Sequence, residues 1–359
     1  MVLSDLDIAR WRLRTQHLVE PGLVSASDVV SSLLAVQAEN PAQSAWAVAT
    51  RTGEPDPADL AAALDDGRVL RTHVLRPTWH YVTADDLVWL VDVTASGAGR
   101  PILQQLRAGH DDAALDRLRE TVLTGLAGTH LTRPDVGELL EQSGRPLGGH
   151  DLMLLMADLE LRALVCSGPV ADGVHSYALV ADRVPTSRRP GREEALAELA
   201  WRYFTGHGPA TVEDLAYWGT LPVADVRAGV AAVSDRLASF EHVGRTFWHA
   251  PDREPPAGPP QPAAHLLQIL DETYRGYSTA SRWVLDAAGA VPRSREAAIG
   301  MALVDGQLVA GMKRTVTARR VSFSLRPYAS WDAAALPHVE EAAARYGAFL
   351  GLEPVVELA

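Results

Sequence analysis

The chain has 359 residues, of which 47% are hydrophobic, a normal content for a globular protein with two to four compact units. Its single cysteine, Cys166, excludes an internal disulfide or a thiolate metal cluster, and the scattered histidines lack zinc-binding spacing, so we expect no metal and no cofactor. The N-terminus alternates charge, and no apolar run approaches the roughly 18 residues of a membrane helix, which predicts a cytoplasmic protein.

The net charge of −12 argues by itself against nucleic acid, but the charge is unevenly distributed. Lysine and arginine total 33, and Lys313 is the only lysine. A GC-rich genome explains most of this preference for arginine over lysine, although arginine side chains also bind phosphate oxygens in pairs. The cationic residues gather in two places, one holding Arg71, His73 and Arg76, the other Lys313, Arg314, Arg319, Arg320 and Arg326.

A pattern of helices followed by a β-hairpin recurs three times, as expected for winged-helix units. In the first copy, Asn40 before Pro41 predicts the start of a helix. Apolar periodicity in this copy predicts helices over 6–18, 26–37, 41–51 and 57–65, and a hairpin over 69–82.

The second and third copies begin with capped helices. Thr132 caps the first helix of the second copy, and Thr211 with Asp214 resembles a capping box in the third. The second copy predicts helices over 133–142 and 150–162 and strands over 163–166 and 175–180. The third predicts a helix ending at Trp218, a helix over 222–235, and strands over 237–242 and 245–249.

Residues 251–263 are proline-rich and predict a linker, after which the periodicity becomes that of strands. Asp305–Gly306 predicts a tight hairpin between strands over 298–304 and 307–312. A strand over 319–328, a helix over 332–350 and a last strand over 354–358 complete this module.

We therefore predict a mainly α fold with β-hairpin wings (α+β), made of three tandem winged-helix units and a small β-rich C-terminal domain. The predicted bounds are 1–98, 99–185 and 190–250 for the three units, 251–263 for the linker and 264–359 for the last domain.

Gln37 and Glu39 are the most informative residues of the chain. Gln37 continues an apolar helical stripe where a core helix would carry leucine or alanine. If the backbone around Ala38 is extended, Gln37 and Glu39 point the same way and place an amide and a carboxylate side by side, facing inward. The plainer interpretation is that Gln37 satisfies a buried backbone group and Glu39 is solvated.

The motifs LLAVQAENPAQSAW, VLRTHVLRPTWHYV, GPATVEDLAYWGTL and VDGQLVAGMKRT resemble the bacterial winged-helix DNA glycosylases of the AlkZ/YcaQ type over nearly the whole chain. The resemblance implies excision of alkylated or crosslinked bases, with three winged helices and a C-terminal β-rich domain around a DNA channel. It also implies a catalytic Gln-x-Gln or Gln-x-Asp signature, which Gln37 matches. Glu39 departs from both forms, being longer than aspartate and ionisable where glutamine is not.

The residues suggest how such a reaction would proceed. Alkylation at purine N3 or N7 makes the leaving base cationic, so one carboxylate suffices: Glu39 would activate the water, and Gln37 would hold it through its carbonyl oxygen. A lyase needs an amine. Lys313 and the N-terminus are the only amines, so we expect a monofunctional hydrolase.

Duplex DNA that carries a damaged base is the expected partner. We expect no membrane and no obligate protein partner, and we expect the protein to be a nucleoid-associated monomer. The expected contacts with the DNA backbone are Arg71, His73, Arg76, His80, Lys313 and Arg314, with His80 toward the channel and Trp79 toward the core. A regulator that binds DNA without chemistry, or a scaffold that binds none, would share the architecture. The Gln37–Glu39 pair argues against the regulator, which has no use for such a pair. Salt-dependent DNA binding would separate both DNA-binding hypotheses from the scaffold, because phosphate contacts release counterions.

Overall fold

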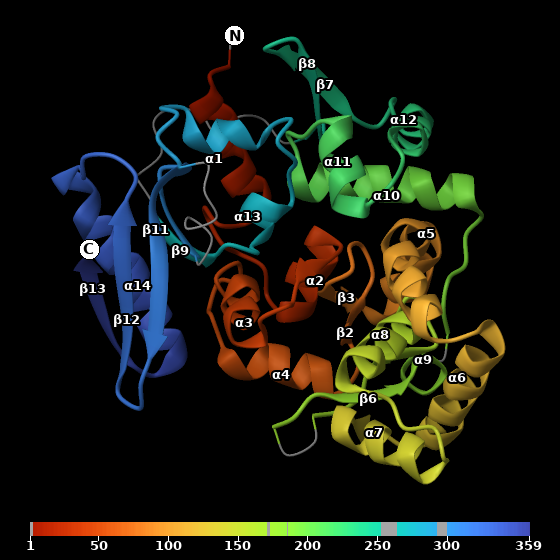
Figure 1. Cartoon of the computed structure of the whole chain (residues 1–359). Helices are drawn as coiled ribbons and strands as arrows, with labels where there is room; N and C mark the ends of the chain where they lie inside the picture. Colours follow the sequence, from red (N-terminus) through yellow and green to blue (C-terminus); the bar gives the residue numbers. More distant parts are fainter. Residues whose placement is uncertain (1–2, 171–172, 185, 253–263, 293–299) are drawn as a thin grey trace.

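One order of elements recurs three times along the chain: a helix, a short strand or bridge, two helices and a β-hairpin. The computed structural model describes residues 3–170, 173–184, 186–252, 264–292 and 300–359. Figure 1 shows the first copy at the centre of the molecule, the second and third on one side of it, and the C-terminal module on the other.

The first copy surrounds a three-stranded sheet of order β1-β3-β2. Leu34 adopts φ +66°, which ends α2 and turns the chain into β1, so the predicted helix over 26–37 is wrong in its last turn. Pro41 opens α3 as predicted, and Asn40 precedes it in extended conformation. The elements are α1 (Asp5–Thr15), α2 (Ala26–Leu33), β1 (Val36–Gln37), α3 (Pro41–Ala49), α4 (Pro57–Asp65), β2 (Val69–His73) and β3 (Trp79–Thr83).

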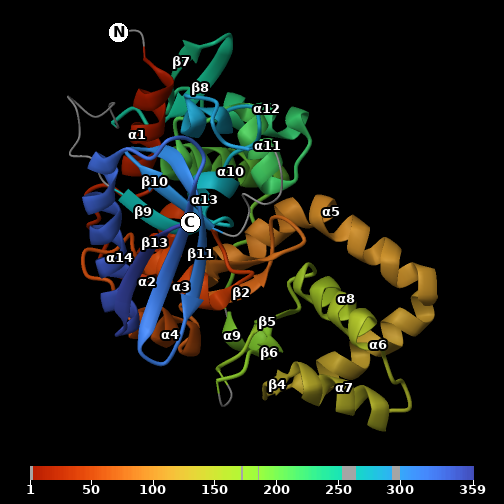
Figure 2. The ribbon, with the colours of Figure 1, turned by 60° about the vertical axis from the view of Figure 1, so that its left-hand side comes forward.

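The second copy follows a long helix, α5 (Ala84–Gly109), that the sequence patterns missed. Figure 2 shows α5 leading away from the rest of the molecule into a lobe formed by the second copy. The sheet has the order β4-β6-β5, and Thr132 caps α7 as predicted. The elements are α6 (Asp112–Leu126), β4 (Leu131–Thr132), α7 (Arg133–Gln142), α8 (Gly149–Glu160), β5 (Val165–Ser167), β6 (Ser176–Leu179) and α9 (Val180–Arg183).

The third copy replaces its first strand by a bridge between Ala210 and Trp248. The predicted capping box of Thr211 and Asp214 is present at the start of α11. The elements are α10 (Arg192–His207), α11 (Val212–Gly219), α12 (Val223–Ala232), β7 (Ala238–His242) and β8 (Arg245–His249).

The C-terminal module is a five-stranded sheet of order β13-β12-β11-β10-β9. Asp305 and Gly306 both have positive φ, +51° and +77°, which confirms the predicted tight hairpin. The proposed linker lies outside the described residues from 253 onward. The elements are β9 (Ala264–Gln268), α13 (Glu272–Arg275), η1 (Arg282–Asp286), β10 (Gly300–Val304), β11 (Gln307–Val316), β12 (Arg320–Pro327), η3 (Ala333–Ala335), α14 (Leu336–Leu350) and β13 (Glu353–Leu358).

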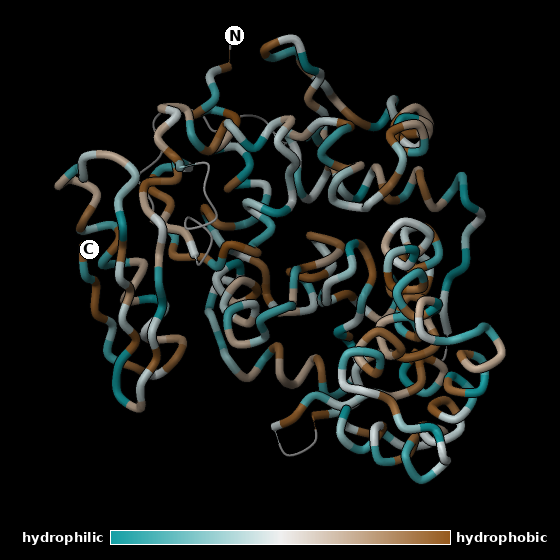
Figure 3. The backbone as a smooth tube through the Cα atoms, viewed as in Figure 1, coloured by the Kyte–Doolittle hydropathy of each residue, from teal (hydrophilic) through white to brown (hydrophobic). Residues whose placement is uncertain are grey.

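The α+β class is therefore confirmed; the identity of the three copies as winged helices, and their domain bounds, stay predictions. Apolar and polar residues interleave along the helices (Figure 3), and no helix in the described ranges is long and apolar enough to cross a membrane.

The C-terminal module packs against the first copy and shares its core. Ile8 and Leu13 of α1 belong to the same buried cluster as Leu303 of β10. Trp46 of α3 donates its indole N–H to the Leu266 carbonyl at 3.0 Å and stacks on Tyr346 with ring centroids 4.5 Å apart. These contacts fix β9 and α13 beside β1, where Gln37 lies.

The buried pair of Arg51 and Asp271 also joins these two parts, with a 2.8 Å contact and both side chains fully buried. Arg51→Met would leave the Asp271 carboxylate without its countercharge, so we expect the free energy of unfolding to fall by about 3–5 kcal/mol. Arg68→Ala, which removes an exposed pair with Asp66, should lower the free energy of unfolding far less, because solvent screens that pair. Urea denaturation measures both, and similar losses in the two variants would contradict this assignment.

Candidate active site at strand β1

Gln37 lies on β1, where its partner across the sheet is His80 of β3. The side chain is 2% exposed, so the expectation of a buried amide is confirmed. Its backbone N–H donates to Oε1 of Glu272 at 3.0 Å. Gln37 is therefore held by a sheet on one side and by a carboxylate from the C-terminal module on the other.

The hydrogen bonds of the Gln37 amide fix its orientation. Oε1 accepts from Nη2 of Arg76 at 3.1 Å and from the Thr78 hydroxyl at 3.4 Å. Because a guanidinium only donates, the atom beside Arg76 must be the amide oxygen. We expected this oxygen to hold a water molecule, but it is already occupied. The amide nitrogen makes no hydrogen bond with the described residues, so Gln37 offers a donor.

Glu39 is exposed, so the expectation that it faces inward is wrong. Its Oε2 accepts the backbone N–H of Trp79 at 3.2 Å, and the Ala38 N–H donates to the Trp79 carbonyl at 2.8 Å. Gln37 and Glu39 thus both contact the start of β3, one from the interior and one from the solvent side.

Arg71 and His73 lie inside the protein, each 7% exposed, and not at a solvated hairpin turn. The Arg71 guanidinium stacks 4.2 Å from the centroid of the Trp79 ring and donates to the Ala38 carbonyl. His73 pairs with the buried carboxylate of Glu160, which also accepts the Trp79 indole N–H. Their partners are therefore protein groups, and a role for either residue in contacting DNA stays a prediction.

His80 is fully buried and Trp79 is partly exposed, the reverse of the expected orientation. His80 donates from Nδ1 to the Thr78 carbonyl at 3.0 Å and accepts from Arg76 at Nε2, a pattern that requires the neutral ring. Burial, reinforced by the positive charge of Arg76, lowers the pKa of His80 to about 3. His80 therefore holds Arg76 in place and carries no charge near neutral pH.

Glu272 is the residue around Gln37 that sequence reasoning missed. Its Oε2 accepts the Trp218 indole N–H at 2.8 Å and faces Nε2 of His207 at 3.4 Å. Burial alone would raise the pKa of Glu272, but His207, Arg76 and His80 together lower it to about 2. The carboxylate is thus ionised and fully buried. No pattern in the sequence signalled this contact, which spans 235 positions from Gln37.

The second cationic group is not buried with the first. Lys313 is exposed on β11, and Arg314 donates to the Tyr346 hydroxyl at 2.6 Å and to the Ala42 carbonyl at 3.3 Å. Arg314 thereby reaches α3 three positions beyond Glu39. The structure brings Arg76 and His80 to Gln37, Arg71 and His73 to Trp79, and Arg314 to the start of α3.

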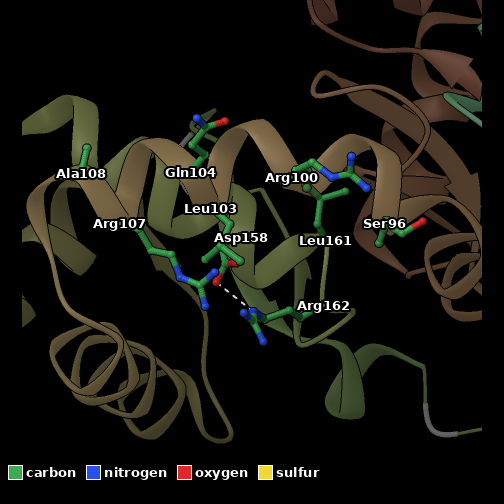
Figure 4. A pocket seen from close by; sticks show the side chains of 11 residues that line it. Ser96, Arg100, Leu103, Gln104, Arg107, Ala108, Asp158, Leu161 and Arg162 are labelled. Carbon is green, nitrogen blue, oxygen red and sulfur yellow. Dashed lines mark hydrogen bonds and ion pairs between the residues drawn. The ribbon is translucent and has the colours of Figure 1, made fainter.

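A hollow of about 720 Å³ lies between α5 and α8, away from these residues. Figure 4 shows Arg100, Arg107 and Arg162 around it, with Arg162 paired to Asp158. None of the expected site residues lines this hollow, so the candidate site is the start of β3 beside β1.

Comparison with known proteins identifies relatives along the whole chain. The family model described as DNA glycosylase AlkZ-like matches residues 30–349. An interstrand DNA cross-link repair glycosylase of Streptomyces sahachiroi is 25% identical over 326 residues, which cover 86% of this chain and 87% of the relative. The solved structure of the Streptomyces sahachiroi DNA glycosylase AlkZ superposes with a TM-score of 0.78 at 22% identity and full coverage of both chains, which shows the same fold.

The buried histidines make stability dependent on pH. Burial and nearby arginines also lower the pKa of His175 and His265 to about 3. Between pH 6.5 and 3 the unfolded chain binds protons that the folded chain rejects, so stability is full above pH 6.5 and is lost as the pH falls. We expect the free energy of unfolding to drop from pH 7 to 5, and the ring of His80 to show no NMR titration between pH 5 and 8. A titrating His80 ring, or stability that rises on acidification, would contradict this account.

Proposed function

The chain belongs to the AlkZ-like family of DNA glycosylases, and from this premise we propose that it excises alkylated purines from duplex DNA by monofunctional hydrolysis at Gln37 and Glu39. The observation that supports this most directly is the contrast between the two side chains. A buried, oriented amide and an exposed carboxylate meet at one end of β3.

The cationic leaving base makes this simple arrangement sufficient. A purine alkylated at N3 or N7 already carries positive charge, so its departure needs no proton from the protein. The barrier then lies in placing a water molecule at C1′ and stabilising the oxocarbenium-like sugar. One carboxylate supports both steps, because it accepts the proton of the water and its charge favours the cationic sugar.

Gln37 and Glu39 would divide the work on the water molecule. The free N–H of the Gln37 amide donates to the water oxygen, and Glu39 accepts one of the water protons. The second lone pair of the oxygen remains available to attack C1′. Because Arg76 and Thr78 fix the amide, its donor points in one direction before DNA binds.

The same site would also accept bulky adducts, and we propose crosslinked bases as a second substrate class. The relative from Streptomyces sahachiroi is named for interstrand crosslink repair. In this chain Glu39 lies on the solvent side of β3, so a large adduct has no need to fit into an enclosed space. Lys313 is exposed on β11 and makes no hydrogen bond with the described residues around Gln37, in keeping with hydrolysis without a Schiff base.

A non-catalytic DNA-binding regulator is the alternative. It would bind alkylated and intact duplex alike and release no base. The orientation of the Gln37 amide by two donors, Arg76 and Thr78, favours the enzyme, because a regulator has no use for a buried amide with a free donor.

Glu39→Ala should slow excision of N7-methylguanine about a hundredfold to ten-thousandfold without weakening DNA binding, because it removes the general base. Glu39→Gln should retain some activity on this cationic lesion, and Gln37→Ala should lose more than Glu39→Gln does. Single-turnover release of free base measures the rates. Glu54→Ala, which removes another exposed carboxylate of the first copy, is the control. Base release that survives Gln37→Ala, Glu39→Ala and the double change would mean that the pair is structural.

Glu272→Gln should slow base release, since its amide cannot accept from both the Gln37 N–H and the Trp218 indole N–H. The loss of one buried hydrogen bond should also lower the free energy of unfolding by about 1–3 kcal/mol. Asp271→Asn is the matched control, because Asp271 is equally buried, adjacent in the chain and bonded to Arg51 instead of Gln37. At a temperature where both variants are folded, only Glu272→Gln should lose activity; equal rates would show that Glu272 acts through stability alone.

A further inference from the structure

Three arginines from different segments meet around Tyr217 of α11. The guanidinium carbons of Arg76 and Arg282 lie 5.8 Å and 5.5 Å from the centroid of its ring. Together with Arg282 and Arg76, Arg275, the last residue of α13, lowers the pKa of the Tyr217 phenol against the effect of burial. All four side chains are partly exposed, so the cluster is accessible from solvent.

The positive charge of this cluster is incompletely balanced. The carboxylate that acts on Arg76 is Glu272, which already accepts from Gln37, Trp218 and His207. Burial lowers the pKa of Arg76, and repulsion from Arg275 and Arg282 lowers it further, against the attraction of Glu272. Three guanidinium groups this close together repel one another, and an anion that joined them would offset the repulsion.

One donor of the cluster also lacks a partner. Nε of Arg275 is buried and makes no hydrogen bond with any residue that the structure describes. A buried N–H without an acceptor costs free energy, and in a native protein it calls for a specific explanation. By contrast, Arg282 donates to the Tyr274 and Tyr277 carbonyls, and Arg76 donates to the Arg275 carbonyl and to Gln37. The cluster is thus built into the fold and contains one donor whose hydrogen bond is unsatisfied.

We propose that Arg76, Arg275, Arg282 and Tyr217 bind a phosphodiester group of the DNA strand beside the nucleotide to be excised. Guanidinium forks match the paired oxygens of a phosphate, and the phenol hydroxyl donates to a third position. This inference rests on the proposed function, because the position of the cluster beside Gln37 is what assigns the phosphate to the reacting nucleotide.

Binding of the phosphate would also prepare Gln37. The anion offsets the repulsion among the three guanidinium groups and holds Arg76, which in turn holds the Gln37 oxygen at 3.1 Å. The amide donor therefore keeps the direction that Arg76 and Thr78 already give it when the strand is in place. Arg76 therefore joins backbone recognition to the orientation of the catalytic amide.

The test uses Arg275→Gln, which removes the unpartnered donor, and Tyr217→Phe as a second variant that leaves the arginines intact. Fluorescence anisotropy measures the affinity for an N7-methylguanine duplex over a range of salt concentrations. Arg275→Gln should weaken binding about tenfold and reduce the salt slope by roughly one. Arg192→Gln, which removes an exposed arginine paired with Asp225, should leave the slope unchanged.

Duplexes with one neutral methylphosphonate at each position flanking the lesion locate the contact. At one position, the methylphosphonate should weaken DNA binding by the wild type as much as Arg275→Gln does. The same methylphosphonate should not weaken binding by Arg275→Gln any further. Additive losses, or an unchanged slope in both Arg275→Gln and Tyr217→Phe, would overturn the proposal. The proposal would also be overturned if inorganic phosphate stabilised the wild-type protein but not Arg275→Gln while both bound DNA equally. The ligand of the cluster would then be a free anion and not the DNA backbone.

Base release from the same duplexes separates this inference from the proposed function. If the wild type shows the predicted salt slopes and releases no base, the phosphate site stands and the glycosylase activity on this lesion fails. If Arg275→Gln binds and excises as the wild type does, the activity stands and the phosphate site fails.

Discussion

The candidate site depends on one buried carboxylate, that of Glu272. An ionised group inside a protein is strongly destabilising unless donors and positive charges surround it. The donors here are the backbone of Gln37 on β1 and the indole of Trp218 on α11, with His207 of α10 and the charge of Arg76 nearby. The first copy, the third copy and the C-terminal module must therefore converge on this point, and Gln37 lies where they meet.

This convergence gives the two candidate catalytic residues different environments. Gln37 is buried and its amide is oriented by Arg76 and Thr78. Glu39 is exposed, and among the residues that the structure describes its side chain bonds only to a backbone N–H. The buried environment of Gln37 suits a fixed hydrogen-bond donor. The exposed environment of Glu39 suits a proton acceptor that exchanges protons with solvent. Glutamate at position 39 differs from the glutamine or aspartate that the resemblance implies there, but it keeps an acceptor oxygen. The conserved fold at 22% identity shows how far the sequence diverges while the architecture remains.

Local chemistry made part of this structure predictable. The hairpin at Asp305–Gly306, the caps at Thr132 and Thr211, and the helix start at Pro41 follow from the conformational preferences of single residues. The long helix α5 was missed because Gly97, Gly99 and Pro101 argue against a helix, yet Gly97 lets α5 approach the backbone of Thr220. The end of α2 was misplaced because nothing local announces the positive φ of Leu34.

The site was harder to predict than the fold for the same physical reason. The sequence pattern correctly placed Gln37 in the interior, but which of Trp79 and His80 faces solvent depends on the register of β3 against β1. Glu272 reaches Gln37, and Arg76 and Arg282 reach Tyr217, only through tertiary contacts between distant segments. Periodicity and spacing carry no information about such contacts.

The most direct test of the account is the fate of an N7-methylguanine duplex incubated with the wild-type protein under single-turnover conditions, with borohydride present in a parallel sample. We expect free N7-methylguanine, an intact strand that carries an abasic site, and no covalent complex trapped by borohydride. Duplex that is bound without any release of base, or a trapped complex, would contradict monofunctional hydrolysis at Gln37 and Glu39.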